Sequence, residues 1–237
     1  MTDASDPGAL LAPSPLETWP PAWSPAAVVM DCDGLLVDTE GRWLALQEDY
    51  LADHGASLDP EARRALTGRP IEVVVTTIAE AIGKDPHRAG AELMAAHQER
   101  LEEPLVPLPG VVRTVRAVAA VRPVAVASNS PRDLLERTLD ALGLTGAFDA
   151  RVSLDDVAAG KPAPDLYLAA AAALGTDPAD CLALEDSETG ARAALAAGMQ
   201  LIAVPSIPGQ DPVAPRRLDS LEDPVLADWI SSWEARR

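Results

Sequence analysis

The stretch AAVVMDCDGLLVDTE, residues 26–40, joins a short apolar run to a group of acids. Its first part, Ala26 to Asp31, is a short apolar run of the kind that forms a buried strand. The acids Asp31 and Asp33 stand two residues apart at the end of that run, with Gly34 behind them. Open parallel sheets bind ligands at the carboxyl ends of their strands. In a sheet of that kind, the acids of this stretch would lie where a ligand is expected.

Further apolar runs alternate with segments of helical pattern along the rest of the chain. Alternation of strand and helix is typical of a parallel sheet whose two faces are covered by helices. The sequence thus predicts an α/β fold with a Rossmann-like three-layer core. The other expected strands are Pro123 to Ser128, Phe148 to Val152, Cys181 to Glu185 and Gln200 to Val204, and the expected core helices lie near 110–120, 131–143, 163–175 and 187–198.

One connection is too long for an ordinary crossover between parallel strands. Residues 40–106 carry amphipathic helical patterns, and we expect them to form an inserted, all-helical cap domain. The catalytic core would then comprise residues 26–39 and 107–237. Residues 1–25 contain six prolines and are expected to form a flexible tail. Its tryptophans could dock on the core or remain free.

Charge and composition exclude several classes of partner. The 237 residues carry a net charge of −18, which would repel nucleic acid and an anionic membrane. Two cysteines are too few for a disulfide framework, and no export signal or membrane span is evident, so a soluble cytoplasmic protein is expected. A small-molecule partner and a monomer are the default expectations.

A second pair of acids follows the fourth expected strand, in CLALEDSETG, residues 181–190. Glu185 and Asp186 would reach the same edge of the sheet as Asp31 and Asp33. Two acid pairs at neighbouring strand ends can share one cation. A few carboxylates with room for water and an anionic substrate favour Mg²⁺ over a fully caged Ca²⁺.

Two more segments place polar groups at strand ends. Lys161 is one of two lysines in the chain and stands in the rigid frame GKPAPD, residues 160–165. A compact ammonium suits a crowded group of acids better than a guanidinium does. The segment with Ser128 and Asn129 turns from a strand into a helix, where hydroxyl and backbone N–H groups can hold an oxyanion.

These four segments, in this order and with a helical insert after the first, resemble the haloacid dehalogenase superfamily. The likeness spans roughly residues 26–205 and is greatest to its sugar phosphatases and to the β-phosphoglucomutases. DCDGLLVDTE, GKPAPD and LEDSETGARAALAAG together carry the resemblance, whereas Ser128 alone would be weak.

The resemblance implies a Mg²⁺-dependent phosphatase that acts on a small phosphorylated metabolite, such as a sugar or polyol phosphate, through an aspartyl phosphate. Asp31 would be the nucleophile and Asp33 the general acid and base. Lys161 would be the catalytic cation. Metal ligands would be the carboxylates of Asp31 and Asp186 with the Asp33 carbonyl, and Glu185 would be a further ligand or a support. Ser128, Asn129 and Gly34 would contact the phosphoryl group, and Glu40 and Arg69 would contact the leaving group.

Other interpretations of the same residues stay open at this stage. A β-phosphoglucomutase-type mutase is the alternative enzyme, although the stretch Asp38 to Trp43 lacks the histidine that resembling mutases carry there. Arg69 and Arg132 could still bind a second phosphate. Ser128 and Asn129 could cap a helix without touching substrate. A non-catalytic binding protein on the same fold is disfavoured, because such a protein would be expected to have lost at least one of the four side chains needed for catalysis. All four are present: Asp31, Asp33, Lys161 and Asp186.

Overall fold

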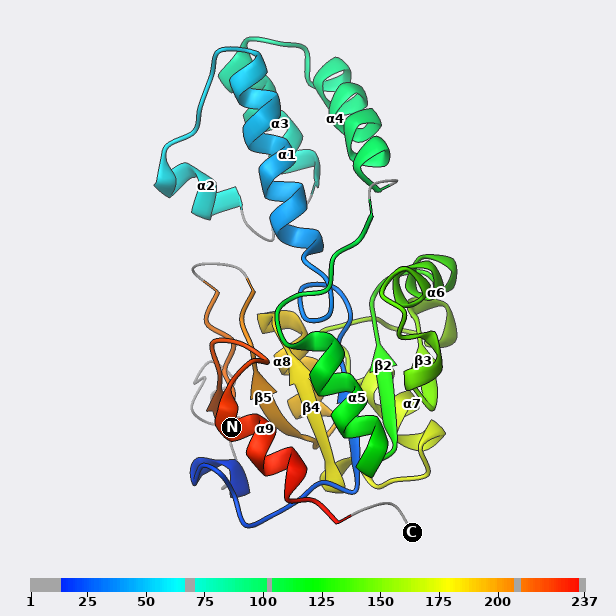
Figure 1. Cartoon of the computed structure of the whole chain (residues 1–237). Helices are drawn as coiled ribbons and strands as arrows, with labels where there is room; N and C mark the ends of the chain where they lie inside the picture. Colours follow the sequence, from blue (N-terminus) through cyan, green and yellow to red (C-terminus); the bar gives the residue numbers. More distant parts are fainter. Residues whose placement is uncertain (1–13, 67–70, 102–103, 207–209, 235–237) are drawn as a thin grey trace, which may run out of the picture. The chain divides into compact units, whose positions relative to one another are not determined.

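The computed structural model describes residues 14–66, 71–101, 104–206 and 210–234. The chain divides into two compact units (Figure 1). One unit comprises Met1–Asp38 and Leu105–Arg237, and the other comprises Thr39–Pro104.

The first unit is built on a six-stranded sheet in the order β3-β2-β1-β4-β5-β6, in which every neighbouring pair is parallel. Parallel strands buried on both faces read as continuous apolar runs, and β1, β2 and β4 are buried at every position. The strands are β1 (Ala27–Met30), β2 (Val124–Ala127), β3 (Ala150–Val152), β4 (Cys181–Glu185), β5 (Gln200–Ala203) and β6 (Arg216–Arg217).

Helices cover both faces of this sheet (Figure 1). Val28 and Met30 of β1 pack into one apolar cluster with residues of α5, α6 and α9, whereas Ala27 and Val29 pack into another with residues of α7 and α8. Successive side chains of a strand point to opposite faces, so each strand contributes to both clusters. The predicted three-layer α/β core is confirmed. The helices are α5 (Val111–Val121), α6 (Arg132–Ala141), α7 (Asp165–Ala173), α8 (Glu188–Ala196) and α9 (Pro224–Ser231).

Two elements of this unit were not predicted. The strand β6 has only two residues, both arginine, and pairs with the edge of the sheet at β5. Helix α9 begins after Asp223, whose carboxylate caps the Leu226 N–H at 2.9 Å. Short 3-10 turns lie at Pro15–Glu17, Thr145–Ala147, Leu154–Asp156 and Pro178–Asp180.

Residues 14–25, the described part of the expected flexible tail, pack on the first unit and are not free, whereas residues 1–13 of that tail lie outside the described residues. Leu16 is fully buried in the apolar cluster of α5, α6 and α9. The Arg216 guanidinium donates to the Leu16 carbonyl at 2.9 Å, and the rings of Trp19 and Trp229 meet edge to face at 5.3 Å. Burial of large apolar side chains offsets the entropy lost by ordering the backbone, which the proline content alone did not suggest.

Between Thr39 and Pro104, the residues that the structure describes form helices and no strand. The apolar core of this second unit joins the three longer helices through Leu51, Ile78 and Leu93, each of which is buried. None of the described helices, in either unit, has the length and apolar character needed to cross a membrane. The helices of this unit are α1 (Thr39–Asp53), α2 (Pro60–Leu66), α3 (Ile71–Ile82) and α4 (Pro86–Leu101).

Candidate active site

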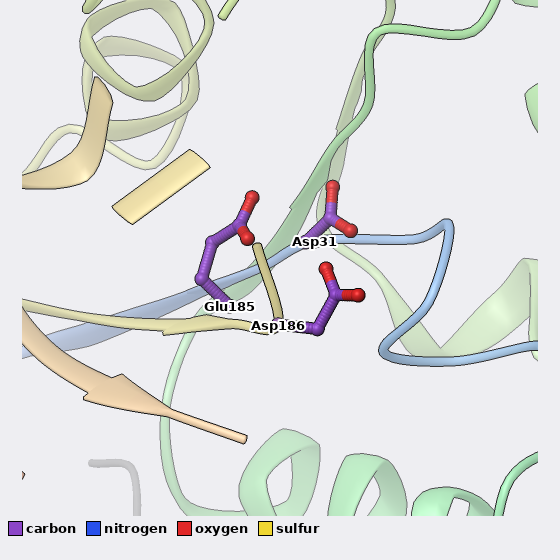
Figure 2. Close-up of side chains that lie close together, drawn as sticks. All are labelled: Asp31, Glu185 and Asp186. Carbon is purple, nitrogen blue, oxygen red and sulfur yellow. The ribbon is translucent and has the colours of Figure 1, made fainter. Parts of the chain in front are cut away.

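Three acidic side chains meet at the carboxyl ends of β1 and β4. Met30 pairs with Leu184 in the parallel register, and the Asp31 N–H donates to the Leu184 carbonyl at 3.0 Å. Asp31 therefore leaves β1 beside Glu185 and Asp186. One carboxylate oxygen from each of these three buried acids lies within 4.8 Å of the others (Figure 2). That spacing allows the three acids to share a metal ion.

Lys161 joins two of these acids. Its Nζ lies 2.7 Å from Glu185 Oε1 and also donates to Asp31 Oδ1. The three side chains are only 5%, 1% and 6% exposed, respectively. The Tyr167 ring lies beneath the ammonium, with its centroid 5.2 Å from Nζ. The structure thus brings Lys161 to the acids, as its sequence frame predicts.

Both oxygens of Glu185 are already bound by neighbouring groups. Oε1 accepts from Lys161 Nζ and from the Tyr167 hydroxyl at 3.1 Å, and Oε2 accepts from the backbone N–H and hydroxyl of Ser187 at 2.8 and 2.9 Å. A Cβ atom at Gly190 would lie 1.5 Å from Oε1, so only glycine leaves room for this carboxylate. Of the two roles expected for Glu185, the arrangement favours support of Lys161 over direct metal binding.

Asp33 faces two serines. The hydroxyls of Ser128 and Ser130 both donate to Asp33 Oδ2 at 2.8 Å. Ser128 is fully buried at the end of β2, and Asp33 is partly exposed. The carboxylate of Asp33 therefore points toward the β2 end, and the expected metal contact of this residue is through its backbone carbonyl.

Glycines allow close approach at two points. Gly34 has a φ of 90°, in the left-handed region, and a Cβ there would lie 2.0 Å from Asp186 Oδ2. Gly160 lies next to Asn129, and a Cβ there would lie 2.6 Å from Asn129 Oδ1. That same oxygen accepts the Lys161 N–H at 2.8 Å. Asn129 thus fixes the backbone that carries Lys161, and phosphate contact by Gly34 or Asn129 stays a prediction.

Burial and crowding raise the pKa of two of the acids. Burial raises the pKa of Asp31 well above its ordinary value, with Lys161 opposing that rise. Burial and the neighbouring Glu185 raise the pKa of Asp186 to about 7. Burial also opposes ionisation of Glu185, yet the charge of Lys161 and its hydrogen bonds lower the pKa of that acid. Conversely, burial would lower the pKa of Lys161, but Asp31 and Glu185 raise it well above the ordinary value.

The donor set fits a hard divalent cation. Three carboxylates face a single ammonium, so ionisation of all three leaves an excess of negative charge in a buried place. Burial and, to a lesser extent, repulsion by the neighbouring acids raise the pKa values of Asp31 and Asp186. All candidate ligand atoms are oxygens, which Mg²⁺ and Ca²⁺ prefer over softer ligands. The buried acidic cluster can therefore bind a metal ion.

Several supporting residues were missed from the sequence. Ser130, Tyr167 and Ser187 hold Asp33 or Glu185, and the Ser206 hydroxyl donates to Asp186 Oδ2 at 2.5 Å. Ser130 could have been chosen, because it stands beside Ser128 in the turn after the second strand. Nothing in the local sequence marks Ser206, which reaches Asp186 only through the fold.

Two predicted specificity residues cannot be placed. Glu40 lies in α1, but its side chain is outside the described part of the structure. Arg69 lies outside the described residues altogether. Their roles toward a substrate stay predictions.

Known proteins resemble this chain over most of its length. A family model for haloacid dehalogenase-like hydrolases matches residues 25–198. The fructose-1-phosphate phosphatase YqaB of Escherichia coli K12 is 35% identical over 76% of this chain and 96% of its own length. Hexitol phosphatase B of the same strain is 36% identical over 86% of this chain and 96% of its own.

Solved structures give the same result. A haloacid dehalogenase family hydrolase from Deinococcus radiodurans, solved with bound phosphate and sodium, is 32% identical. It has a TM-score of 0.73 over 86% of this chain and 96% of its own. The resemblance drawn from the motifs is confirmed, because the family match and the relatives each cover most of the chain. The chain belongs to the haloacid dehalogenase-like hydrolases.

Proposed function

We propose that this hydrolase is a Mg²⁺-dependent phosphatase of sugar or polyol phosphates that works through an aspartyl phosphate on Asp31. The observation that carries the proposal is the convergence of Asp31, Asp186 and Lys161 at one edge of the sheet. Asp31 is a buried carboxylate that can act as a nucleophile. The Lys161 ammonium and a metal ion held by Asp186 would offset its negative charge when an anionic substrate binds.

In the first half of the reaction, a carboxylate oxygen of Asp31 attacks phosphorus. An oxygen–phosphorus bond to Asp31 forms as the bond to the leaving oxygen breaks. Asp33 donates its proton to that oxygen, so the product leaves as an alcohol. The Lys161 ammonium and the hydroxyl of Ser128 stabilise the charge on the phosphoryl oxygens.

In the second half, the aspartyl phosphate is hydrolysed. Asp33, now ionised, takes a proton from water as the water oxygen attacks phosphorus. The bond between phosphorus and the Asp31 oxygen breaks, which releases inorganic phosphate and regenerates the carboxylate. One side chain thus acts first as an acid and then as a base.

The carboxylates of Asp31 and Asp186 would hold the metal ion, with the Asp33 backbone carbonyl completing the protein's share. When bound, the ion neutralises phosphoryl charge and polarises the phosphorus–oxygen bonds. Glu185 would stay outside the metal shell, because it accepts four hydrogen bonds, from Lys161, Tyr167 and Ser187.

The substrate class rests on the relatives and on the helical unit. Two relatives are named for fructose 1-phosphate and hexitol phosphates, which are phosphorylated sugars or polyols. The helical unit, with Glu40 and Arg69, would act as the cap that recognises the leaving group. A cytoplasmic monomer is part of the proposal, and both cysteines are free and buried, in keeping with a reducing compartment.

The mutase alternative receives less support from the core. Arg132, one candidate for gripping a second phosphate, already pairs with Glu136 at 3.3 Å and with Asp156. It also donates to the Arg151 carbonyl at 3.0 Å. Release of inorganic phosphate without a hexose bisphosphate activator would separate hydrolysis from isomerisation.

The decisive experiment measures phosphate release from a panel of phosphorylated sugars and polyols with Mg²⁺. We expect turnover by the wild-type protein and none by Asp31→Asn, which removes the nucleophile but retains the side-chain shape. Asp140→Asn, an exposed change in α6, is the matched control and should retain full activity. Equal turnover by the Asp31 and Asp140 variants would reject the covalent mechanism.

A further inference from the structure

We propose that Ser130 is a positioning residue that holds the carboxyl group of Asp33 while the leaving oxygen is protonated. The inference rests on the proposed function and adds a residue to it. Ser130 follows the expected phosphate-binding pair Ser128 and Asn129, yet its contact is with Asp33 rather than with the acids around Lys161.

The hydrogen bonds around Asp33 are concentrated on one oxygen. Oδ2 accepts from the hydroxyls of both Ser128 and Ser130 at 2.8 Å. Within the part of the chain that the structure describes, no hydrogen bond reaches Oδ1. The two serines therefore anchor one oxygen of the carboxyl group and leave the other to face a leaving group.

The two anchors cannot both persist during turnover. A serine hydroxyl has one proton to donate. The Ser128 oxygen already accepts the Ser130 N–H at 2.9 Å, and its single proton goes to Asp33. If Ser128 donates to a phosphoryl oxygen, as the proposed function requires, it must release Asp33. Ser130 is then the remaining anchor of Oδ2.

Ser130 is well fixed for this role. Its N–H donates to Ser128 Oγ, and its carbonyl accepts the Leu154 N–H at 3.1 Å. Its backbone is thereby tied both to the end of β2 and to the turn after β3. A hydroxyl on so constrained a backbone loses little further freedom when it binds Asp33, so it can keep the acid oriented after substrate binds.

The test compares two aryl phosphates that share a ring but differ in leaving group. p-Nitrophenolate departs readily without protonation, whereas phenolate is more basic and gains more from a general acid. kcat/KM reports the steps up to release of the phenol. We expect Ser130→Ala to lower kcat/KM about tenfold for phenyl phosphate and less than about twofold for p-nitrophenyl phosphate.

Two variants control for other roles of the turn. Ser130→Thr keeps the hydroxyl and should restore most of the activity toward phenyl phosphate. Ser128→Ala should lower kcat/KM by similar factors for both substrates, because it removes a contact to the phosphoryl group itself. Thermal unfolding midpoints of all variants show whether the turn is intact.

Asp33→Asn distinguishes the failure of this inference from the failure of the proposed function. Asp33→Asn should lower kcat/KM more for phenyl phosphate than for p-nitrophenyl phosphate, and the difference should be larger than for Ser130→Ala. Suppose that Asp33→Asn shows this preference. If Ser130→Ala then lowers kcat/KM equally for phenyl and p-nitrophenyl phosphate, or lowers it for neither, the positioning role of Ser130 is rejected. If Asp33→Asn itself hydrolyses both substrates at the wild-type rate, the acid–base role of Asp33 is rejected instead.

Discussion

The ammonium of Lys161 lies 2.7 Å from Glu185 Oε1, and both side chains are almost completely buried. Glu185 in turn is fixed by Tyr167 and Ser187. The position of the Lys161 ammonium therefore depends on a series of buried contacts, from Tyr167 and Ser187 to Glu185 and from Glu185 to Lys161. None of these residues is proposed to bind the metal ion. Each contact can be broken by one substitution.

Lys161→Met should destabilise the protein by about 3 kcal/mol at pH 8 in the presence of a chelator, because it leaves buried carboxylates without a counter-charge. The cost should shrink toward pH 5, because loss of the Lys161 charge raises the pKa values of Glu185 and Asp31, and these acids can then take up protons. Urea unfolding at both pH values measures the difference. Arg116→Met, an exposed change in α5, should shift stability by less than about 0.5 kcal/mol. A pH-independent cost for the Lys161 variant would contradict this account.

Stabilisation by Mg²⁺ should depend on pH through Asp186. Its folded pKa is raised from 3.8 to about 7, so the metal-free folded state binds more protons than the unfolded state between these values. The stability of the metal-free protein therefore falls as pH rises across this window. Since Mg²⁺ binds the ionised carboxylates, its affinity should fall by at least about tenfold per pH unit below 7, and more steeply where Asp31, whose pKa is also raised, becomes protonated.

The readout is the shift of the unfolding midpoint on adding Mg²⁺. We expect a clear rise at pH 8 and little change at pH 5. Asp186→Asn should abolish the rise at pH 8, and Asp140→Asn should keep it. A shift of the same size at both pH values would show that Asp186 is not a ligand.

The strands and core acids could be predicted because their signals are local. β1 and β4 are apolar runs, and Asp31 and Asp186 follow them directly, so strand parallelism alone brings these acids to one edge of the sheet. Lys161 was recognised from its Gly and Pro frame and from the resemblance to a known family.

The residues that were missed depend on long-range packing. Ser206 reaches Asp186 from the segment after β5, and no spacing rule connects the two. Both residues of β6 are arginine, so no apolar run marks this strand in the sequence. Leu16 is an isolated apolar residue among prolines, and its burial depends on surfaces that form only after the sheet and α9 assemble.

Leu16→Ala should lower the free energy of unfolding by about 3 kcal/mol, the usual cost of truncating a fully buried leucine. Chemical denaturation measures it. Ala22→Ser, at an exposed position of the same segment, is the matched control and should have little effect. Equal stability of the two variants would mean that residues 14–25 do not pack on the core in solution.

For Gly190→Ala, the sequence alone and the structure predict opposite changes in the free energy of unfolding. Gly190 lies in α8, where alanine would ordinarily stabilise a helix by about 1 kcal/mol relative to glycine. Here the added Cβ would lie 1.5 Å from Glu185 Oε1, so the carboxylate must move and its bonds to Lys161 and Tyr167 must weaken.

We therefore expect the opposite sign: a loss of about 1–3 kcal/mol from overpacking, together with a fall in phosphatase activity. Gly146→Ala, where an added Cβ would meet no atom within 4 Å, should change neither property appreciably. Unfolding midpoints and phosphate release, measured on the same preparations, test both effects. A more stable and fully active Gly190 variant would mean that Glu185 does not occupy this position, and the orientation of Lys161 would then need another cause.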